Sequence, residues 1–232
     1  MLLSNNYLLL IWKDPNTRTN YTIGKLSHDE KYEFEYLESA KNATVAGWEP
    51  LEAFPEQGKI YKSKNLFPVF SSRLPDRKRR DIEKILSKYE LNAFDEFQLL
   101  RKSGARLPID TYEFVDPIFS DEENIERDFY IMGIRHHAAC GGSNCEFLPS
   151  VHVGDLLRLE EEPQNKHDEF AIKVLTAQGE FLGYIPRYYS KSITERIQSG
   201  MTYSCKILEI AADRNCSECM KVRLNMPRKS VG

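Results

Sequence analysis

The fold of the second half of the chain is decided by residues 153–190, which read VGDLLRLEEEPQNKHDEFAIKVLTAQGEFLGYIPRYYS. Three short apolar runs, DLLRLEEE, AIKVLTA and EFLGYIP, are separated by polar turns, the second of them at Gln178 and Gly179. Short runs rich in branched and aromatic residues between turn residues are typical of strands. The stretch therefore predicts neighbouring strands, followed by a helix near RYYSKSITERIQSG (187–200).

Strand patterns continue on both sides of this stretch. FYIMGIRHH (129–137) precedes it, and SCKILEIAA (204–212) and MKVRLNM (220–226) follow it. Several short strands with one helix predict a small barrel or a curved sheet. The fold class expected for the whole chain is α+β, with a small sheet and helices in the first half and an OB-like β-barrel with one helix in the second.

The segment EPQNKHDEFAIKV (162–174) crowds Asp, Asn, His and Glu into a few positions. It suggests a metal loop, a catalytic cluster or a rigid turn that leads into a strand. A calcium loop is excluded, because the alternating oxygen ligands, the central Gly and the closing Glu at the right spacing are missing. We interpret the segment as a turn fixed by Pro163, in which Asn165 bonds its own backbone, before Ala171 and Ile172 enter a core strand.

The second half resembles the HIRAN domain. The resemblance spans about residues 127–212 and lies in the segments GIRHH, GDLLRLEEEPQNKHDEFAIKV and GEFLGYIP. It implies a small barrel related to OB-folds. The characterised members of this family grip the 3′ end of single-stranded DNA, so the resemblance implies the same ligand here.

The family's site, carried over by position, gives a set of candidate nucleic-acid-binding residues. Arginine donates to phosphates and flat rings stack on bases, which is the combination that single-strand binders use. Asp168 is expected to accept the terminal 3′-hydroxyl, because a carboxylate accepts hydrogen bonds and repels an extra phosphate. The full set is Arg135, His136, His137, His167, Asp168, Tyr184, Arg187 and Tyr188.

His136 and His137 stand where the DNA-gripping relatives have flat aromatic residues. Histidine is expected to stack less strongly and to make binding more sensitive to pH. The formal net charge of −3 gives no global attraction to nucleic acid, so DNA binding needs a local patch. An alternative function is therefore a protein-interaction module whose HIRAN-like barrel no longer binds DNA.

The first half begins with strand-like runs, which are YLLLIWKD (7–14), TNYTIGKLSH (19–28) and KYEFEYL (31–37). One helix is expected to begin near Pro75, with an apolar stripe that starts at Ile82. A second helix is expected to follow a cap at Asn92 and to end at Gly104.

The segments LFPVFSSRLPDRKRR (66–80) and FDEFQLLRKSGA (94–105) resemble the N-terminal subdomain of HipA-type kinases, the toxins of toxin–antitoxin modules. The resemblance covers most of residues 5–118. No catalytic-loop or metal-binding signature of a kinase body is found downstream. The resemblance implies a protein-interaction domain that docks on a HipA-like kinase, with an antitoxin-type role as a kinase regulator.

Two features of the first half each have two interpretations. Trp48, in GWEPLEAFP (47–55), suits an aromatic anchor for a partner or a cover for the domain's own core. The basic run RKRR (77–80) suits a solvated helix start or a surface for an anionic partner, because cations at a helix start oppose the helix dipole.

The length and composition of the chain, together with one irregular segment near its middle, predict two domains. The chain has 232 residues, of which 41% are hydrophobic, and each half is long enough to bury a core. The segment VDPIFSDEENIERD (115–128) has Pro117, an acidic run and little periodicity, which predicts domains at 1–118 and 127–227 with a linker at 119–126. Without an apolar run long enough for a membrane span or a signal peptide, a cytoplasmic location is expected.

All five cysteines lie in the second half. Two pairs, Cys140 with Cys145 and Cys216 with Cys219, have spacings that suit a tetrahedral zinc site, whereas the HIRAN resemblance implies no metal and no other cofactor is expected. A cysteine–histidine hydrolase matches no known nucleophile signature. The sequence therefore predicts a non-enzymatic adaptor that joins single-stranded DNA 3′ ends to a HipA-like kinase or another protein.

Overall fold

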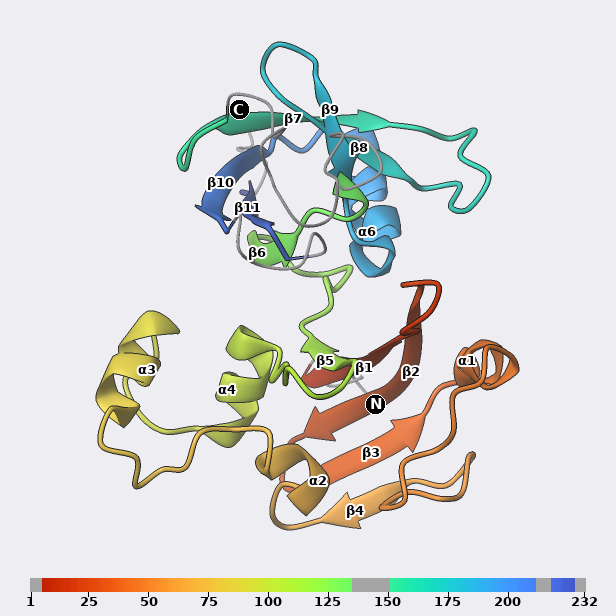
Figure 1. The fold of residues 1–232 in the computed structure, drawn as a ribbon, viewed down its shortest axis with the longest axis vertical. Helices are drawn as coiled ribbons and strands as arrows, with labels where there is room; N and C mark the ends of the chain where they lie inside the picture. The colour runs from red at the N-terminus through yellow and green to blue at the C-terminus, as the bar shows by residue number, and fades with distance from the viewer. Residues whose placement is uncertain (1–5, 135–150, 212–217, 228–232) are drawn as a thin grey trace. The chain divides into compact units, whose positions relative to one another are not determined.

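The computed structural model of the protein describes residues 6–134, 151–211 and 218–227. The chain divides into two compact units, Met1–Pro117 and Ile118–Gly232. Each unit has its own antiparallel sheet and short helices, which confirms the α+β fold class (Figure 1). Within the described ranges, no helix has the length and apolar character that a membrane span requires.

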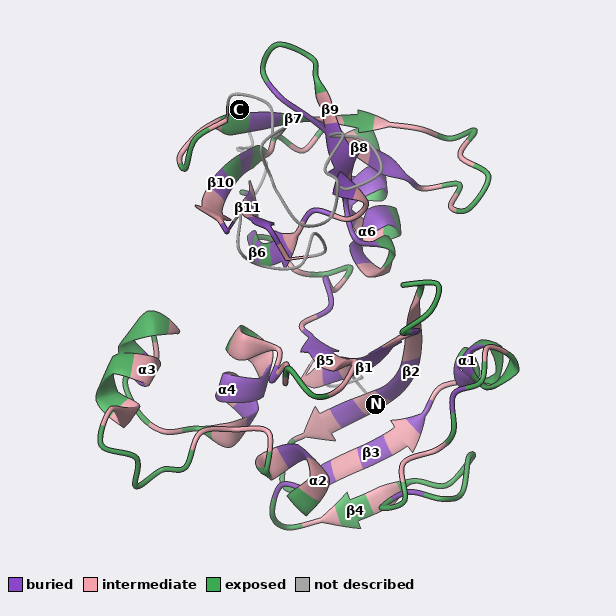
Figure 2. Ribbon diagram, viewed as in Figure 1, coloured by how far each residue is buried: buried purple, intermediate pink, exposed green. Residues whose placement is uncertain are grey.

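Unit 1 is built on a five-stranded antiparallel sheet with the order β4-β3-β2-β1-β5 (Figure 1). Its strands are β1 (Tyr7–Lys13), β2 (Asn20–His28), β3 (Tyr32–Tyr36), β4 (Tyr61–Ser63) and β5 (Tyr112–Val115). The first three strands coincide with the three runs that the sequence predicts. Along β3 the residues alternate between buried and half-buried (Figure 2), as expected of a strand with one face on the core.

The helices of unit 1 are short, and two of the sequence predictions about them are wrong. They are α1 (Ala40–Val45), α2 (Pro68–Ser71), α3 (Ile82–Lys88) and α4 (Glu96–Ser103). The cap of α4 is Asp95, whose carboxylate accepts the Gln98 N–H at 3.0 Å, and not Asn92. Gly104 ends α4 in the left-handed conformation (φ +69°), as predicted.

The helix expected from Pro75 does not begin there. Pro68 occupies the first turn of α2, and α3 begins only at Ile82. Between them the Asp76 carboxylate accepts the Lys78 N–H at 2.7 Å, which fixes a local turn instead of a helix. The basic run 77–80 therefore lies in an exposed turn ahead of α3 and not inside the helix start.

The core of unit 1 is dominated by aromatic rings. The Phe34 ring centroid lies 4.4 Å from that of Phe54 and 5.3 Å from that of Phe70. Trp48 is only 2% exposed, and its indole N–H donates to the Tyr112 hydroxyl at 3.0 Å. Trp48 thus covers the domain's own core and is not available as an anchor for a partner.

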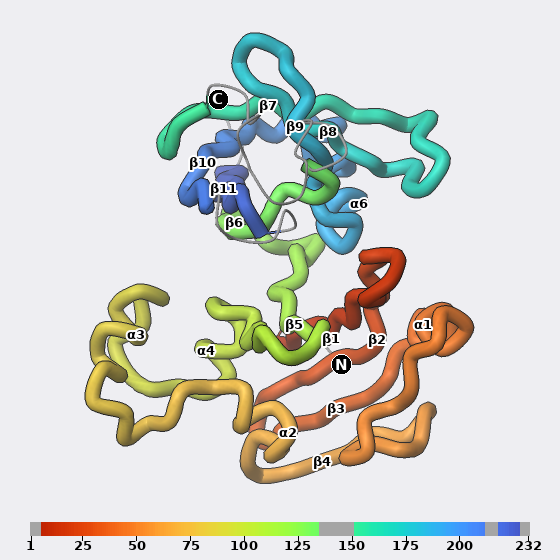
Figure 3. The backbone as a smooth tube through the Cα atoms, in the orientation of Figure 1, coloured from red at the N-terminus to blue at the C-terminus, as the bar shows by residue number. Residues whose placement is uncertain are grey.

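Unit 2 is a six-stranded antiparallel sheet that curls into a half-barrel, with the order β6-β11-β10-β7-β8-β9 (Figure 1). Its strands are β6 (Ile125–Tyr130), β7 (Leu156–Glu161), β8 (Ile172–Leu175), β9 (Phe181–Tyr184), β10 (Ser204–Ile210) and β11 (Met220–Met226), and helix α6 (Arg187–Gln198) follows β9. Figure 3 traces the chain through the successive β7–β8 and β8–β9 hairpins, which are the strands predicted from residues 153–190.

The curl of this sheet brings its two ends together. Met132, just after β6, forms an antiparallel bridge to Tyr184 at the end of β9, with both N–H···O distances at 2.9 Å. Gly183 permits this approach, because a Cβ there would lie 2.3 Å from the Met132 carbonyl oxygen. A glycine in β9 is therefore a condition for closing the half-barrel.

The segment that the sequence predicts as a linker, 119–126, lies in unit 2. Arg127 is 8% exposed and holds the Glu122 carboxylate through both of its terminal nitrogens, at 2.9 and 2.8 Å. Arg196 of α6 donates to the Phe119 carbonyl oxygen. These contacts fix residues 119–127 on the helix and first strand of unit 2.

Candidate nucleic-acid interface

The turn between β7 and β8 is ordered by its own side chains. At its base, the Glu162 N–H donates to the Ala171 carbonyl oxygen at 2.8 Å. Within it, the side-chain oxygen of Asn165 accepts the backbone N–H of His167 at 2.9 Å and that of Asp168 at 3.3 Å. This confirms the bonding predicted for Asn165, which holds the backbone of His167 and Asp168 in place.

Glu162 ties this turn to the adjacent strands. One carboxylate oxygen lies 2.8 Å from Lys173 Nζ on β8. The other accepts the Asn165 side-chain N–H at 2.6 Å and the Tyr184 hydroxyl at 2.9 Å. The Lys173 hydrogen bond, followed by that of Asn165, lowers the pKa of Glu162 to about 2. Glu162 is therefore ionised at neutral pH and joins the turn, β8 and β9.

Asp168 links the same turn to α6. Its Oδ1 accepts the Phe170 N–H at 3.0 Å, and its Oδ2 lies 2.7 Å from the hydroxyl of the buried Ser190. Thr194, one turn further along α6, donates to the Phe170 carbonyl oxygen at 3.2 Å. A carboxylate has about four acceptor sites, so the half-buried Asp168 keeps acceptor capacity for a further donor.

Tyr184 is held more firmly than the sequence indicates. Its hydroxyl is hydrogen-bonded to Glu162, and its ring meets Phe181 edge-on, with the centroids 5.1 Å apart. Burial, followed by the hydrogen bond to Glu162, raises the pKa of Tyr184. The side chain therefore supports the turn from the end of β9.

Helix α6 begins with the predicted Arg187 and Tyr188. Arg187 is exposed, and no described residue pairs with its guanidinium group. Tyr188 is half-buried, with its ring edge-on to Tyr189 at 4.7 Å, whereas Tyr189 is 4% exposed and belongs to the core. Because Pro186 gives no side-chain cap, the positive end of the dipole of this 12-residue helix lies at this end without a capping side chain.

The structure brings together five of the predicted residues. Asp168 contacts Ser190 on the first turn of α6, where Arg187 and Tyr188 lie, and Tyr184 contacts the turn through Glu162. His167 is exposed next to Asp168. Arg135, His136 and His137 lie outside the described residues and stay predictions, although the described chain reaches Tyr184 at Met132, just before them.

The zinc prediction also falls largely outside the described residues. Cys140, Cys145 and Cys216 are not among them, and Cys219 is buried, at 1% exposure. In the part of the chain that the structure describes, no three His, Cys, Asp or Glu side chains are grouped as metal ligands. Burial raises the pKa of the fifth cysteine, Cys205, to about 12, which leaves it an unreactive core thiol.

Sequence reasoning missed three residues that build this site, namely Glu162, Lys173 and Ser190. Glu162 and Lys173 meet across the β7–β8 hairpin, close to the pair Glu161 and Ile172. The hairpin pattern contains that signal, because oppositely charged residues across a hairpin attract one another. Ser190 carries no such signal, since its contact with Asp168 spans 22 positions and depends on how α6 packs.

Comparison with known protein families finds one match in each half of the chain. The HIRAN domain family matches residues 126–226, and the HipA N-terminal domain family matches residues 18–108. No curated protein matches the chain.

Two solved structures are similar to parts of the chain. The crystal structure of the HIRAN domain of human HLTF is 16% identical and covers 48% of this chain and 84% of that chain, with a TM-score of 0.36. A crystal structure of a protein from Lactobacillus plantarum is 18% identical and covers 46% of this chain and 99% of that chain, with a TM-score of 0.35.

Proposed function

We propose, from the premise that this chain joins a HipA N-terminal domain to a HIRAN domain, that it is a non-enzymatic adaptor. Its HIRAN domain binds the 3′ end of single-stranded DNA. Its HipA N-terminal domain binds a protein, and a HipA-like kinase is the partner that this domain implies. The pairing of the two domains supports a regulator of antitoxin type that couples such a kinase to DNA ends.

The observation that carries the DNA proposal is the hydrogen bond between Asp168 and Ser190. It holds the β7–β8 turn against the first turn of α6. The Asp168 carboxylate, which accepts hydrogen bonds, and the unpaired cation Arg187 therefore lie on two segments that are in contact. A terminal 3′-hydroxyl donates to the remaining lone pairs of Asp168. The preceding phosphates are received by Arg187, which lies at the positive end of the α6 dipole.

The same arrangement provides selectivity for a strand end. A strand that continued past Asp168 would place another phosphate against this carboxylate and against its acidic neighbours in the turn, Glu162 and Glu169. Like charges in a partly buried site repel. A 3′-phosphorylated strand is therefore expected to bind more weakly than a 3′-hydroxyl strand.

Fluorescence anisotropy with a labelled oligonucleotide tests this proposal. The 3′-hydroxyl strand is expected to bind at least about tenfold more tightly than the same strand with a 3′-phosphate, which corresponds to about 1.4 kcal/mol. Arg187→Ala is expected to weaken binding, whereas Arg158→Ala, an exposed arginine of β7, is the matched control. Equal affinities for the two strands would refute end recognition.

A second candidate function, a HIRAN domain that binds only protein, is favoured by the acidic character of the turn and its base. Glu160, Glu161, Glu162 and Glu169 surround Asp168 in sequence, and the Tyr184 hydroxyl is already hydrogen-bonded. A salt titration separates the two functions. Phosphate contacts make affinity fall steeply as salt is raised, whereas the absence of any DNA binding at low salt would leave the second function.

The protein partner is tested by mixing the full chain with a HipA-like kinase encoded in the same genome. Co-elution in size-exclusion chromatography is expected. Because Trp48 is buried, Trp48→Phe is expected to act on the stability of unit 1 and not specifically on this complex. Separate elution of the kinase and the full chain would refute this partner.

A further inference from the structure

Unit 1 contains a cavity of about 720 Å³. Three segments line it. These are the β2–β3 hairpin with His28 and Tyr32, the segment 71–77 that begins at the last residue of α2, and the segment 94–96 at the start of α4.

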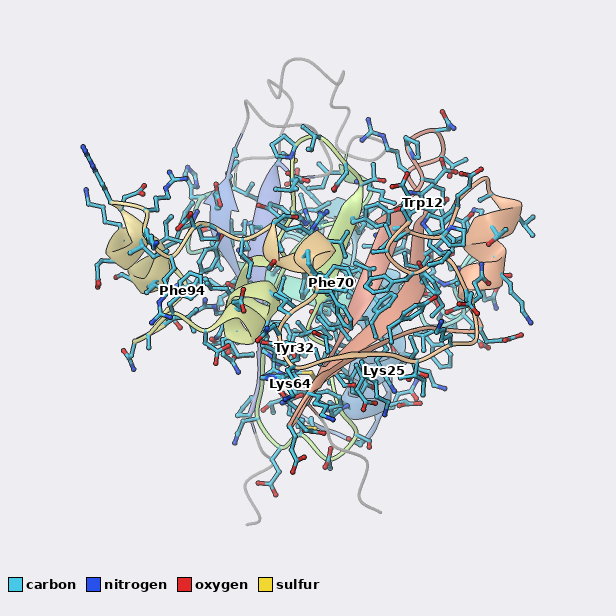
Figure 4. The ribbon with its side chains drawn as sticks, turned by 90° about the horizontal axis from the view of Figure 1, so that it is seen from below. Trp12, Lys25, Tyr32, Lys64, Phe70 and Phe94 are labelled. Atoms are coloured by element: carbon cyan, nitrogen blue, oxygen red, sulfur yellow. The ribbon has the colours of Figure 1, made fainter. Side chains whose placement is uncertain are left out.

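Flat rings form two of its walls. His28 stacks on Tyr32 with the ring centroids 3.9 Å apart and the planes within 7° of parallel. Phe94 also lines the cavity and carries the guanidinium group of Arg77 over its ring, 5.9 Å from the centroid. Figure 4 labels Tyr32 and Phe94, which come from β3 and from the segment ahead of α4. These walls suit a planar cation, because guanidinium groups stack on aromatic faces.

The polar groups of the lining are mostly anionic. Asp76, Asp95 and Glu96 all contribute to it, against the single arginine Arg77. Asp76 and Asp95 accept local backbone N–H groups. Glu96 is half-buried, and no described residue forms an ion pair or a hydrogen bond with its carboxylate. The cavity therefore has acceptor capacity and negative charge that the unit itself does not neutralise.

Tyr32 is an independent sign of a ligand. It lines the cavity, it is only 7% exposed, and among the described residues its hydroxyl has no hydrogen-bond partner. Burial, followed by the charges of Glu96 and Asp95, raises the pKa of Tyr32 to about 12, so the hydroxyl stays neutral beside these carboxylates. The Tyr32 hydroxyl therefore keeps its donor and acceptor sites free at the lining of the cavity, where a polar ligand can use them.

We propose that this cavity binds an arginine side chain of a partner protein. The guanidinium group stacks between the His28–Tyr32 pair and Phe94 and donates to Glu96 and the Tyr32 hydroxyl. A phosphate or a nucleic acid is disfavoured by the carboxylates, and a lysine lacks the flat fork that stacks and donates at once. This inference rests on the proposed role of unit 1 as a protein-interaction domain.

The test uses the ¹⁵N-labelled full chain and N-acetylarginine methylamide as the probe. The probe is added to about 50 mM, because a single side chain binds in the millimolar range at best. Amide shifts are expected at residues 28–32, 71–77 and 94–96. The neutral citrulline analogue is expected to shift none of them, and the lysine analogue is expected to bind several-fold more weakly. Shifts that are absent, or equal for arginine and citrulline, would overturn the proposal.

Two variants place the ligand in the cavity. Glu96→Gln is expected to weaken probe binding about tenfold, and Tyr32→Phe several-fold, because each removes a hydrogen-bond partner of the cation. Glu83→Gln on the exposed face of α3 is the matched control and is expected to have no effect. Unchanged probe affinity in Glu96→Gln would overturn the site.

The same variants separate this proposal from the proposed function. If the probe binds and the kinase does not, the arginine cavity stands and the kinase partner fails. If the kinase binds Glu96→Gln as tightly as the unmodified chain, the complex uses another surface and this proposal fails. DNA binding by unit 2 is expected to be unchanged in all three variants.

Discussion

The substitution Glu162→Gln removes the anion that joins the β7–β8 turn to β8 and β9. Its partners lower the pKa of Glu162 from an ordinary 4.5 to about 2. A group whose pKa is lower in the folded state stabilises the fold above its unfolded pKa and loses that contribution as the pH falls towards its folded pKa. Ionised Glu162 therefore stabilises unit 2 at neutral pH, and this contribution is lost between about pH 5 and pH 2.

The size of this contribution follows from the shift and from the exposure of the pair. A shift of this size would correspond to about 3 kcal/mol if nothing screened the charges. The side chains of Glu162 and Lys173 are each 27% exposed, so solvent screens much of it. We expect Glu162→Gln to lower the free energy of unfolding of unit 2 by about 1–2 kcal/mol at pH 7 and by much less near pH 3.

Urea unfolding followed by far-ultraviolet circular dichroism measures the stability, and hydrogen exchange of peptides from 160–175 assigns the change to the turn. Glu180→Gln, in the exposed β8–β9 turn, is the matched control. The difference between the unmodified chain and Glu162→Gln should shrink as the pH falls from 7 to 3. A difference that stays constant over this range would refute the ionic role of Glu162.

Other substitutions test other contacts. Gly183→Ala is expected to destabilise unit 2 by at least about 2 kcal/mol in thermal unfolding, because the new methyl group would collide with the Met132 carbonyl oxygen; an unchanged melting temperature would contradict the closed half-barrel. Arg73→Ala is expected to cost about 2–3 kcal/mol in urea unfolding followed by tryptophan fluorescence, because it leaves the Asp110 carboxylate and two carbonyl groups without their donor; a loss below about 0.5 kcal/mol would show that water replaces it. The Cys205 thiol is expected to resist thiol reagents in the folded chain and to react in urea, because burial raises its pKa to about 12; rapid labelling without urea would contradict its burial.

The strands of both units were predictable because their signal is local. Apolar and polar residues alternate along KYEFEYL, which predicts a strand. Short turns separate DLLRLEEE, AIKVLTA and EFLGYIP, and they predict which strands lie next to each other. The Asn165 turn was predictable for the same reason, since an Asn side chain bonds the backbone two or three residues further on.

Helix starts were less predictable, because several local signals compete. Pro68 and Pro75 both suit a first helical turn, and Asn92 and Asp95 both suit a cap. The Asp76 turn and the Gln98 hydrogen bond decide between them. Tertiary contacts decide the rest, because no local pattern announces that Ser190 meets Asp168 or that the Tyr184 hydroxyl meets Glu162.

The bridge between Met132 and Tyr184 has a consequence for how the chain behaves in concentrated solution. An open sheet exposes rows of unpaired N–H and C=O groups at its edges, and these recruit strands from other molecules. In unit 2 the strand β9 lies at an edge of the sheet, and the backbone N–H and C=O groups of its residue Tyr184 are hydrogen-bonded to Met132. A variant that opens this bridge, such as Gly183→Ala, is therefore expected to aggregate through β9 before it unfolds completely.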